Sequence, residues 1–400
     1  MPSDPDIPPA TPRAPSEGAV PRAYRICARC VMDTSDPDIE FDAGGHCNHC
    51  RAYDLRAREV LLPAESREAE LRRLVAEIRE TGRDSRYDCV IGVSGGVDST
   101  YVAYLTRQLG LRPLAVHMDN GWNSELAVHN IERMLTRLEI DLHTHVLEWE
   151  EFRGLQVAFL RASVPDLEIP TDHALAAVIY QTAVAHGIPY VLSGSNLATE
   201  GIMATSWVYG VGDWRYIHGV NERHGTGPLR TYPHYGLAGR FYYSALRRIH
   251  TVRLLDLVPY VKRDVLGVLT DELGWQYYGG KHYESIYTRF VQGYILPRKF
   301  GIDKRRAHLS TLICSGQATR EDALAELERH PYEEKLQGED REYVLKRLGF
   351  DEATFEAIMR LPIRGNADFP TYRPLLDRLR RVARMGRIGR AVRSAGSAGI

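Results

Sequence analysis

Short apolar runs alternate with longer segments of helical periodicity between residues 88 and 193. They predict, in order, strand 88–93, helix 97–109, strand 113–118, helix 124–138, strand 142–147, helix 174–186 and strand 189–193. Strands of this length separated by helices of about a dozen residues are typical of a parallel sheet with right-handed crossovers. We therefore predict an α/β fold with a doubly wound parallel sheet.

Different patterns flank this alternation. Residues 54–82 are rich in charged side chains, and their apolar positions follow one helical face, at Leu61, Leu62, Leu71, Leu74, Val75 and Ile78. This spacing predicts one leading helix. Beyond residue 200 the alternation stops. Residues 199–244 are rich in Gly, Trp, Tyr and His, and residues 245–360 have a mostly helical pattern.

The composition narrows the class of protein. A chain of 400 residues can bury a sizeable core, and a formal net charge of -1 gives no overall field that favours nucleic acid. No apolar run approaches the roughly 18 residues of a membrane-spanning helix. Residues 1–23 contain seven prolines and no apolar segment of the signal-peptide kind. We expect a disordered arm there, and a cytoplasmic protein without a nucleic-acid partner.

Four of the six cysteines stand in two C-x-x-C pairs, and sixteen residues separate the pairs. The pairs are Cys27 with Cys30 and Cys47 with Cys50. Two such knuckles can complete a tetrahedral shell of thiolates around one ion, and the spacing is that of a zinc ribbon. We predict a structural Zn²⁺ site. Redox-active pairs are the alternative interpretation, and His46 and His49 are alternative ligands.

The stretch CVIGVSGGVDSTYVAYL, residues 89–105, carries the most specific chemistry. Gly95 and Gly96 lack a β-carbon, so a turn after the first strand can bring backbone N–H groups close to an anion. The helix that follows adds its positive N-terminal end. Ser94 and Ser99 offer hydroxyl groups on either side. The pattern predicts a phosphate-binding turn.

Asp98 indicates which kind of phosphate site this is. Its carboxylate would repel a phosphate unless a divalent cation lay between them, which indicates Mg²⁺. A Walker A loop does not fit, because its nearest approach, ending Gly280-Lys281-His282, lacks the first glycine and the final hydroxyl. No G-x-G-x-x-G follows a strand, which disfavours a dinucleotide-binding turn.

The turn resembles the SGGxDS signature of the PP-loop ATP pyrophosphatases, which have a fold of the adenine nucleotide alpha-hydrolase type. The resemblance implies that ATP is cleaved between its α- and β-phosphates. It implies that the pyrophosphate is held by Ser94, Gly95, Gly96, Val97, Asp98 and Ser99. It also implies adenine contacts at His117 and Met118, after the second strand, and a closing loop at Gly194 and Ser195, after the fourth.

Two longer stretches, residues 31–50 and 278–324, resemble the N-acetyl sugar amidotransferases of bacterial surface-polysaccharide and flagellar-glycan synthesis. The resemblance covers roughly residues 24–330. It implies that ATP adenylates the acetamido oxygen of a sugar, with release of pyrophosphate, and that ammonia-derived nitrogen then replaces this oxygen to give an acetamidino group. Adenylation is chemically necessary because an amide oxygen is a very poor leaving group.

Further site residues are expected around the turn. Lys281 is the candidate for a catalytic cation on the phosphates beside Asp98, because PP-loop synthetases often supply a cation from their C-terminal region. Competing candidates are Lys299, Lys304, Arg305 and Arg306. The residues expected to face the sugar are Asn120, Trp122, Tyr283 and Glu284.

The nitrogen source is expected to be a second protein. The chain opens Met1-Pro2 rather than with a cysteine nucleophile, and neither Cys89 nor Cys314 stands in a nucleophile-elbow setting. We therefore expect a separate glutaminase, and the resemblance implies one like the glutaminase and cyclase subunits of imidazole glycerol phosphate synthase.

The expected organisation has five parts. They are a proline-rich arm at 1–23, a zinc ribbon at 24–53, a PP-loop domain at 54–200 with its leading helix at 54–82, a mostly helical substrate-binding region at 201–370, and an arginine-rich tail at 371–400. The tail has eight arginines and one acid. It fits a partner-docking helix, a peripheral contact with anionic membrane, or nucleic acid.

Other functions share the turn. A PP-loop enzyme that modifies tRNA, by thiolation or lysidine formation, is the first alternative, with Cys314 as a single sulfur carrier. Another biosynthetic enzyme that activates an amide with ATP is the second. A non-catalytic adenine-nucleotide sensor is the third, and the intact Ser94–Ser99 turn disfavours it.

Overall fold

A computed structural model describes residues 23–280, 283–379 and 381 of the chain. The expected disordered arm, apart from residue 23, lies outside the described residues. Lys281 and most of the arginine-rich tail lie outside them as well.

Five parallel strands form one sheet in the order β3-β2-β1-β4-β5. Their bounds are β1 Cys89–Gly92, β2 Pro113–Asp119, β3 Asp141–Val146, β4 Tyr190–Ser193 and β5 His250–Arg253. The central strand is β1, in which Ile91 is paired with Ala115 of β2 on one side and with Leu192 of β4 on the other. The predicted parallel α/β fold is confirmed.

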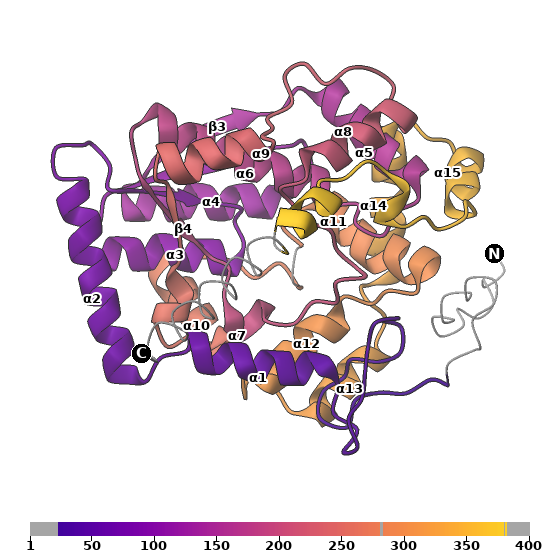
Figure 1. Ribbon diagram of the computed structural model, residues 1–400, viewed down its shortest axis with the longest axis horizontal. Coiled ribbons are helices and arrows are strands. Elements are labelled where there is room, and N and C mark those ends of the chain that lie inside the picture. The colour runs from indigo at the N-terminus through magenta and orange to yellow at the C-terminus, as the bar shows by residue number, and fades with distance from the viewer. Residues whose placement is uncertain (1–22, 281–282, 380, 382–400) are drawn as a thin grey trace, which may run out of the picture.

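Helices pack against both faces of this sheet (Figure 1). The N-terminal and central helices are α1 Asn48–Val60, α2 Ala64–Thr81, α3 Val97–Gln108, α4 Glu125–Leu138, α5 Trp149–Ala162, α6 Ile169–Ala185, α7 Leu197–Glu200 and α8 Trp214–His224. The later ones are α9 Leu237–Phe241, η1 Tyr242–Leu246, η2 Leu254–Leu257, α10 Lys262–Leu273, α11 Ile286–Phe290, η3 Val291–Phe300, α12 Arg305–Cys314, α13 Arg320–Glu328, α14 Glu334–Leu348, α15 Glu352–Met359 and η4 Asn366–Asp368.

The two faces of the sheet belong to two hydrophobic clusters because neighbouring strand residues point in opposite directions. Cys89 and Ile91 pack with α2, α3, α4 and α10. Val90 packs into the larger cluster, which includes α5, α6 and α8. Both faces of β1 are therefore covered, which explains why its sequence is an unbroken apolar run.

The leading segment differs from its prediction. The single helix expected over 54–82 is two helices, α1 and α2, separated at Leu61–Pro63. Proline has no backbone N–H to donate within a helix, so it is tolerated at a helix start but interrupts a continuous one. Leu74, Val75 and Ile78 of α2 are buried, as the apolar stripe predicts. Leu62 is exposed.

The cysteine module is docked on the C-terminal helices, and α1 lies beside α12 (Figure 1). The guanidinium of Arg320 donates hydrogen bonds to the carbonyl oxygens of Cys27 and Cys30. The backbone N–H of Val31 donates to the hydroxyl of Ser310, at 3.2 Å. These contacts join segments that are almost 300 residues apart in the sequence. Within the described ranges, no helix is both long and apolar enough to cross a membrane.

Candidate functional site

The turn after β1 is held in shape by its own two serines. The hydroxyl groups of Ser94 and Ser99 lie 3.1 Å apart, and the backbone N–H of Gly96 donates to the Ser94 hydroxyl at 3.3 Å. Ser99 also donates to the carbonyl oxygen of Gly96, at 3.1 Å. Gly96 is the N-cap of α3 and has no side chain to satisfy the first backbone N–H groups of that helix. Those donors are therefore available to an anion.

Gly95 lies behind the turn rather than in its concave side. Its φ is +79°, a conformation that residues with a β-carbon rarely adopt. A β-carbon there would lie 2.6 Å from the carbonyl oxygen of Ala127 in α4. The indole N–H of Trp275 donates to the Gly95 carbonyl at 3.0 Å, which fixes the turn from a distant part of the chain.

A cavity of about 570 Å³ opens at the carboxyl ends of β1, β2 and β4. The expected phosphate- and adenine-binding residues that line it are Ser94, Gly96, Val97, Asp98, Ser99, His117, Met118, Gly194 and Ser195. The fold brings these segments together because parallel strands all end at the same edge of the sheet. Of the expected ATP-binding residues, Gly95 does not line the cavity.

Asp98 accepts hydrogen bonds from two later segments of the chain. The hydroxyl of Tyr260 donates to its carboxylate, and the amide of Asn196 donates to the same oxygen at 3.4 Å. A β-carbon on Gly194 would lie 3.2 Å from the Asp98 backbone. Burial and the neighbouring Asp98 carboxylate raise the pKa of Tyr260, so its hydroxyl stays a hydrogen-bond donor.

His117 faces the cavity with both ring nitrogens already in contact with protein groups. Nδ1 lies 3.0 Å from the carbonyl oxygen of Val93, which can only accept, so Nδ1 carries the proton. Nε2 then accepts from the amide of Asn123, at 3.1 Å. The ring is thus held in one orientation beside Met118, at the expected position of adenine.

Two of the four residues expected to face the sugar do line the cavity. They are Asn120 and Glu284. Glu284 reaches the turn because residues 284–286 pair with residues 122–124 in an antiparallel bridge. Its carboxylate oxygen lies 3.3 Å from where a β-carbon of Gly96 would be.

The other two do not line the cavity. Trp122 is fully buried, its indole N–H donates to Gln156 at 2.8 Å, and its ring packs against Trp149 and Tyr287. Its large apolar surface belongs to the core. Tyr283 points its hydroxyl at the carbonyl oxygen of Pro331, 3.1 Å away. The expectation that both face the substrate is therefore corrected.

The far wall of the cavity carries charged residues that the sequence did not single out as sugar contacts. Glu168 and Asp172 come from the start of α6, and Lys304 and His308 from the start of α12. Positions 304, 308 and 312 all line the cavity because residues four apart share one face of a helix. In the sequence, only the spacing of four residues indicated that positions 304, 308 and 312 share one face of a helix. Lys304 was considered only as a phosphate contact.

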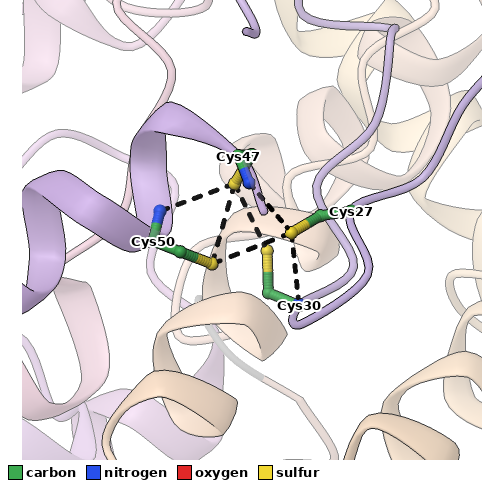
Figure 2. Close-up of side chains that lie close together, drawn as sticks. All are labelled: Cys27, Cys30, Cys47 and Cys50. Atoms are coloured by element: carbon green, nitrogen blue, oxygen red, sulfur yellow. Dashed lines mark hydrogen bonds between the residues drawn. The ribbon is translucent and has the colours of Figure 1, made fainter. Parts of the chain in front are cut away.

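The four paired cysteines converge on one point (Figure 2). All four are buried, and their sulfur atoms lie within 4.8 Å of one another. The measured Sγ–Sγ separations are 3.9 Å for Cys27 with Cys50 and 3.7 Å for both Cys30 and Cys50 with Cys47. Four thiolates about 2.3 Å from one zinc ion would stand roughly 3.8 Å apart. The cluster is therefore compatible with tetrahedral Zn²⁺.

Neither His46 nor His49 belongs to the group of four cysteines, and a fifth cysteine lies beside that group. His49 is paired with the buried carboxylate of Asp36, at 2.7 Å, and His46 is not part of the cysteine group. Cys314, at the end of α12, places its sulfur 3.7 Å from that of Cys50. No local pattern predicts this contact, since 264 residues separate the two cysteines.

Two protein families match separate parts of the chain. Residues 70–152 match the family described as NAD synthase. Residues 284–383 match the family described as LPS biosynthesis protein WbpG-like, C-terminal domain. The first match contains the turn and β2, and the second contains Glu284, Lys304 and His308. No curated protein matches the chain significantly in sequence.

Several solved structures are similar at low identity. A predicted subunit of tRNA methyltransferase from Methanocaldococcus jannaschii is 13% identical, with a TM-score of 0.28, over 46% of this chain and 75% of its own. NMN synthetase from Francisella tularensis is 15% identical, with a TM-score of 0.28, over 55% and 89%. NH3-dependent NAD synthetase from Campylobacter jejuni is 15% identical, with a TM-score of 0.29, over 68% and 99%. At such scores the fold assignment depends on the parallel sheet and the NAD synthase match.

The turn, the sheet and the family matches agree with one another. A PP-loop domain of the NAD synthase kind indicates an ATP-using enzyme of the ligase or synthetase kind. The C-terminal match connects the chain with lipopolysaccharide biosynthesis. Together the two matches show that the chain combines a segment similar to NAD synthase with a C-terminal segment similar to the WbpG-like C-terminal domain.

Proposed function

We propose that the protein is an ATP-dependent amidotransferase that acts on an N-acetylated sugar. It adenylates the acetamido oxygen, releases pyrophosphate, and replaces the oxygen with ammonia-derived nitrogen to give an acetamidino group. One observation carries the proposal. A single cavity is lined both by the SGGxDS turn, within the NAD synthase match, and by residues of the WbpG-like match.

The chemical groups of the SGGxDS turn support adenylation. The backbone N–H groups at the start of α3 and the hydroxyls of Ser94 and Ser99 present donors to the pyrophosphate of ATP. The carboxylate of Asp98 lines the same cavity and fits a divalent cation, because oxygen ligands suit Mg²⁺. Bound there, Mg²⁺ would neutralise charge on the departing pyrophosphate.

The nitrogen donor in this proposal is ammonia from a separate glutaminase of the kind that feeds imidazole glycerol phosphate synthase. Five of the six cysteines gather at the ribbon. The sixth, Cys89, is fully buried in β1, and burial raises the pKa of its thiol. A thiol that stays protonated is a poor nucleophile. Neither Cys89 nor the four clustered cysteines are thus suited to hydrolyse glutamine, and Cys314 does not line the cavity of the turn.

The sulfur-transfer alternative needs a cysteine that can reach the activated atom. Cys314 lies against Cys50 and borders a second cavity, which is lined by residues such as Tyr53, Arg58 and Gln317. It does not line the cavity of the PP-loop turn. The amidotransferase proposal is therefore the better supported of the two.

Mass spectrometry tests the proposal directly. The protein is incubated with ATP, Mg²⁺, an ammonium salt and a panel of N-acetylated nucleotide sugars. We expect one sugar to change by the mass difference between oxygen and NH, with AMP formed in equal amount. Formation of ADP and phosphate with the acceptor present would contradict it, as would pyrophosphate release that requires tRNA instead of a sugar.

A further inference from the structure

Lys304 and Asp172 face the same cavity from different helices without meeting. Lys304 precedes α12 and is 9% exposed, and Asp172 stands in the first turn of α6. Both line the cavity. Neither side chain forms a hydrogen bond or an ion pair within the part of the chain that the structure describes. A buried ammonium group normally has a partner, because leaving it unpaired is costly.

The surroundings of Asp172 explain why its carboxylate is kept for a ligand. Asp172 is an exposed residue of α6, and it lines the cavity. The many protein atoms around its carboxylate still desolvate it, which raises the pKa of Asp172 to about 7, and the nearby carboxylates of Asp166 and Glu168 contribute in the same direction. Lys304 and Glu200 also act on it, with opposite signs. A carboxylate with its pKa near neutrality suits proton transfer.

An amide has the complementary groups. Its carbonyl oxygen accepts hydrogen bonds and its N–H donates one, so it can bridge an ammonium and a carboxylate that do not touch each other. We propose that Lys304 and Asp172 clamp the acetamido group of the acceptor, Lys304 donating to its oxygen and Asp172 accepting from its N–H. This inference rests on the proposed function and extends it to two catalytic residues.

Asp172 then acts as the base of the adenylation step. The amide oxygen forms a bond to the α-phosphorus of ATP, and the bond from that phosphorus to the pyrophosphate oxygen breaks with its electron pair. The proton of the amide nitrogen moves to the Asp172 carboxylate, and the N–H electron pair becomes the second bond of the C=N group. The product is an O-adenylyl imidate in which the C=N group is uncharged and the phosphate keeps its negative charge, and Asp172 later returns its proton to water.

Pyrophosphate release tests both assignments, with the acceptor found in the sugar panel. We expect Asp172→Asn and Lys304→Met to lower kcat/KM for the acceptor by about 100-fold or more, the usual contribution of a positioned base. Binding of a fluorescent ATP analogue should not change. Matched controls are Asp264→Asn, in the exposed first turn of α10, and Lys335→Met, in the exposed first turns of α14. Both controls should keep wild-type rates.

An analogue separates the clamp from a general loss of structure. An O-acetyl ester of the same sugar lacks the amide N–H and is measured as a competitive inhibitor. The wild type should bind the amide more tightly than the ester, and Asp172→Leu, whose side chain has no hydrogen-bond acceptor, should bind both alike. If the variant still preferred the amide, the role of Asp172 would be overturned. A kcat/KM of Asp172→Asn within threefold of the wild-type value would overturn it as well. Loss of ATP-analogue binding in Lys304→Met would overturn the role of Lys304.

Failure of the clamp is distinguishable from failure of the proposed function. If the wild type releases no pyrophosphate with any N-acetylated sugar, the function itself is wrong. If the wild type is active and both variants match their controls, only the clamp is wrong.

Discussion

At Gly95 two requirements coincide, a positive φ and the absence of a side chain. The φ of +79° alone makes an alanine strained, and the 2.6 Å approach to the Ala127 carbonyl adds a clash with backbone that cannot rotate away. The turn thus depends on glycine here for packing against α4 as well as for conformation. The SGGxDS signature alone does not distinguish these two reasons.

Gly95→Ala should destabilise the protein and weaken ATP binding. Gly187→Ala is the matched control, because Gly187 has a φ of +65° and open space around it. Left-handed strain costs roughly 1–2 kcal/mol, so the control should lose about that much free energy of unfolding. Gly95→Ala should lose clearly more. Urea unfolding of both variants measures the difference, and equal losses would show that the contact with Ala127 is unimportant.

Among individual residues, the sequence predicts those whose function depends on a short motif of neighbouring residues. The Ser94–Ser99 turn and the four cysteines are recognisable because their chemistry depends on neighbours in the chain. Lys304 and Asp172 were not predicted as a pair, since only the fold brings α6 and α12 to one cavity. Trp122 was placed after the correct strand, but alternation along the chain could not show that it turns into the core.

At the scale of elements, we expect the ribbon to depend on a bound metal ion. The module from Tyr24 to Cys50 has only two isolated bridges, Ile26 with Asp33 and Phe41 with Cys47, and a small buried core of its own. Metal binding would therefore supply most of its folding free energy. Its four sulfur atoms already lie at zinc-site distances.

Cys27→Ser should lower zinc affinity by more than the roughly 10–100-fold that outer-shell changes cost, and should lower the Tm. Cys314→Ser should retain the zinc, because Cys314 contacts Cys50 without belonging to the group of four. Metal analysis of the purified variants, with a chelator competition, checks this. Equal zinc loss in both variants would instead make Cys314 a ligand.

A buried ion pair holds α11 against α14 and so supports the segment that presents Glu284. The guanidinium of Arg289 donates two hydrogen bonds to the Asp340 carboxylate, at 2.6 and 2.7 Å, and both side chains are at most 10% exposed. Asp340→Ala should cost about 3–5 kcal/mol, because it leaves a buried charge unpaired.

The control for this ion pair lies on the surface of α2. Glu70 pairs with Arg73 in solvent, so Glu70→Ala should leave the free energy of unfolding almost unchanged. Denaturant unfolding compares the two variants. A small loss in Asp340→Ala would mean that solvent reaches Arg289 readily.

The elements of the central sheet were the most predictable part of the fold. Strands β1, β2 and β4 are buried apolar runs, and their predicted bounds differ from the structure by one or two residues. Strand β5 was missed because His250–Arg253 is polar and largely exposed at the edge of the sheet. The long helix α5 was missed too, although nine of its residues are buried.

For the whole molecule, the pKa of Asp172 makes stability depend on pH. The group titrates near 3.8 when unfolded and near 7 when folded, facing Asp166, Glu168, Glu200, Lys304 and His308. Between these values the folded state binds more protons, so the free energy of unfolding contributed by this group falls as pH rises. Asp172→Asn should therefore gain stability relative to the wild type at pH 8 compared with pH 5. Unfolding curves at both pH values test it, and parallel pH dependences would contradict it.

Helix α12 has two occupied sides. One carries Lys304 and His308 toward the cavity, and the other carries Arg306 and Ser310 toward the cysteine module. The module can therefore influence turnover without touching any reactant, since releasing it would leave the helix unsupported from behind. Under the proposed function, zinc deprivation would leave every reactive group in place but loosen the hold of the protein on its acceptor.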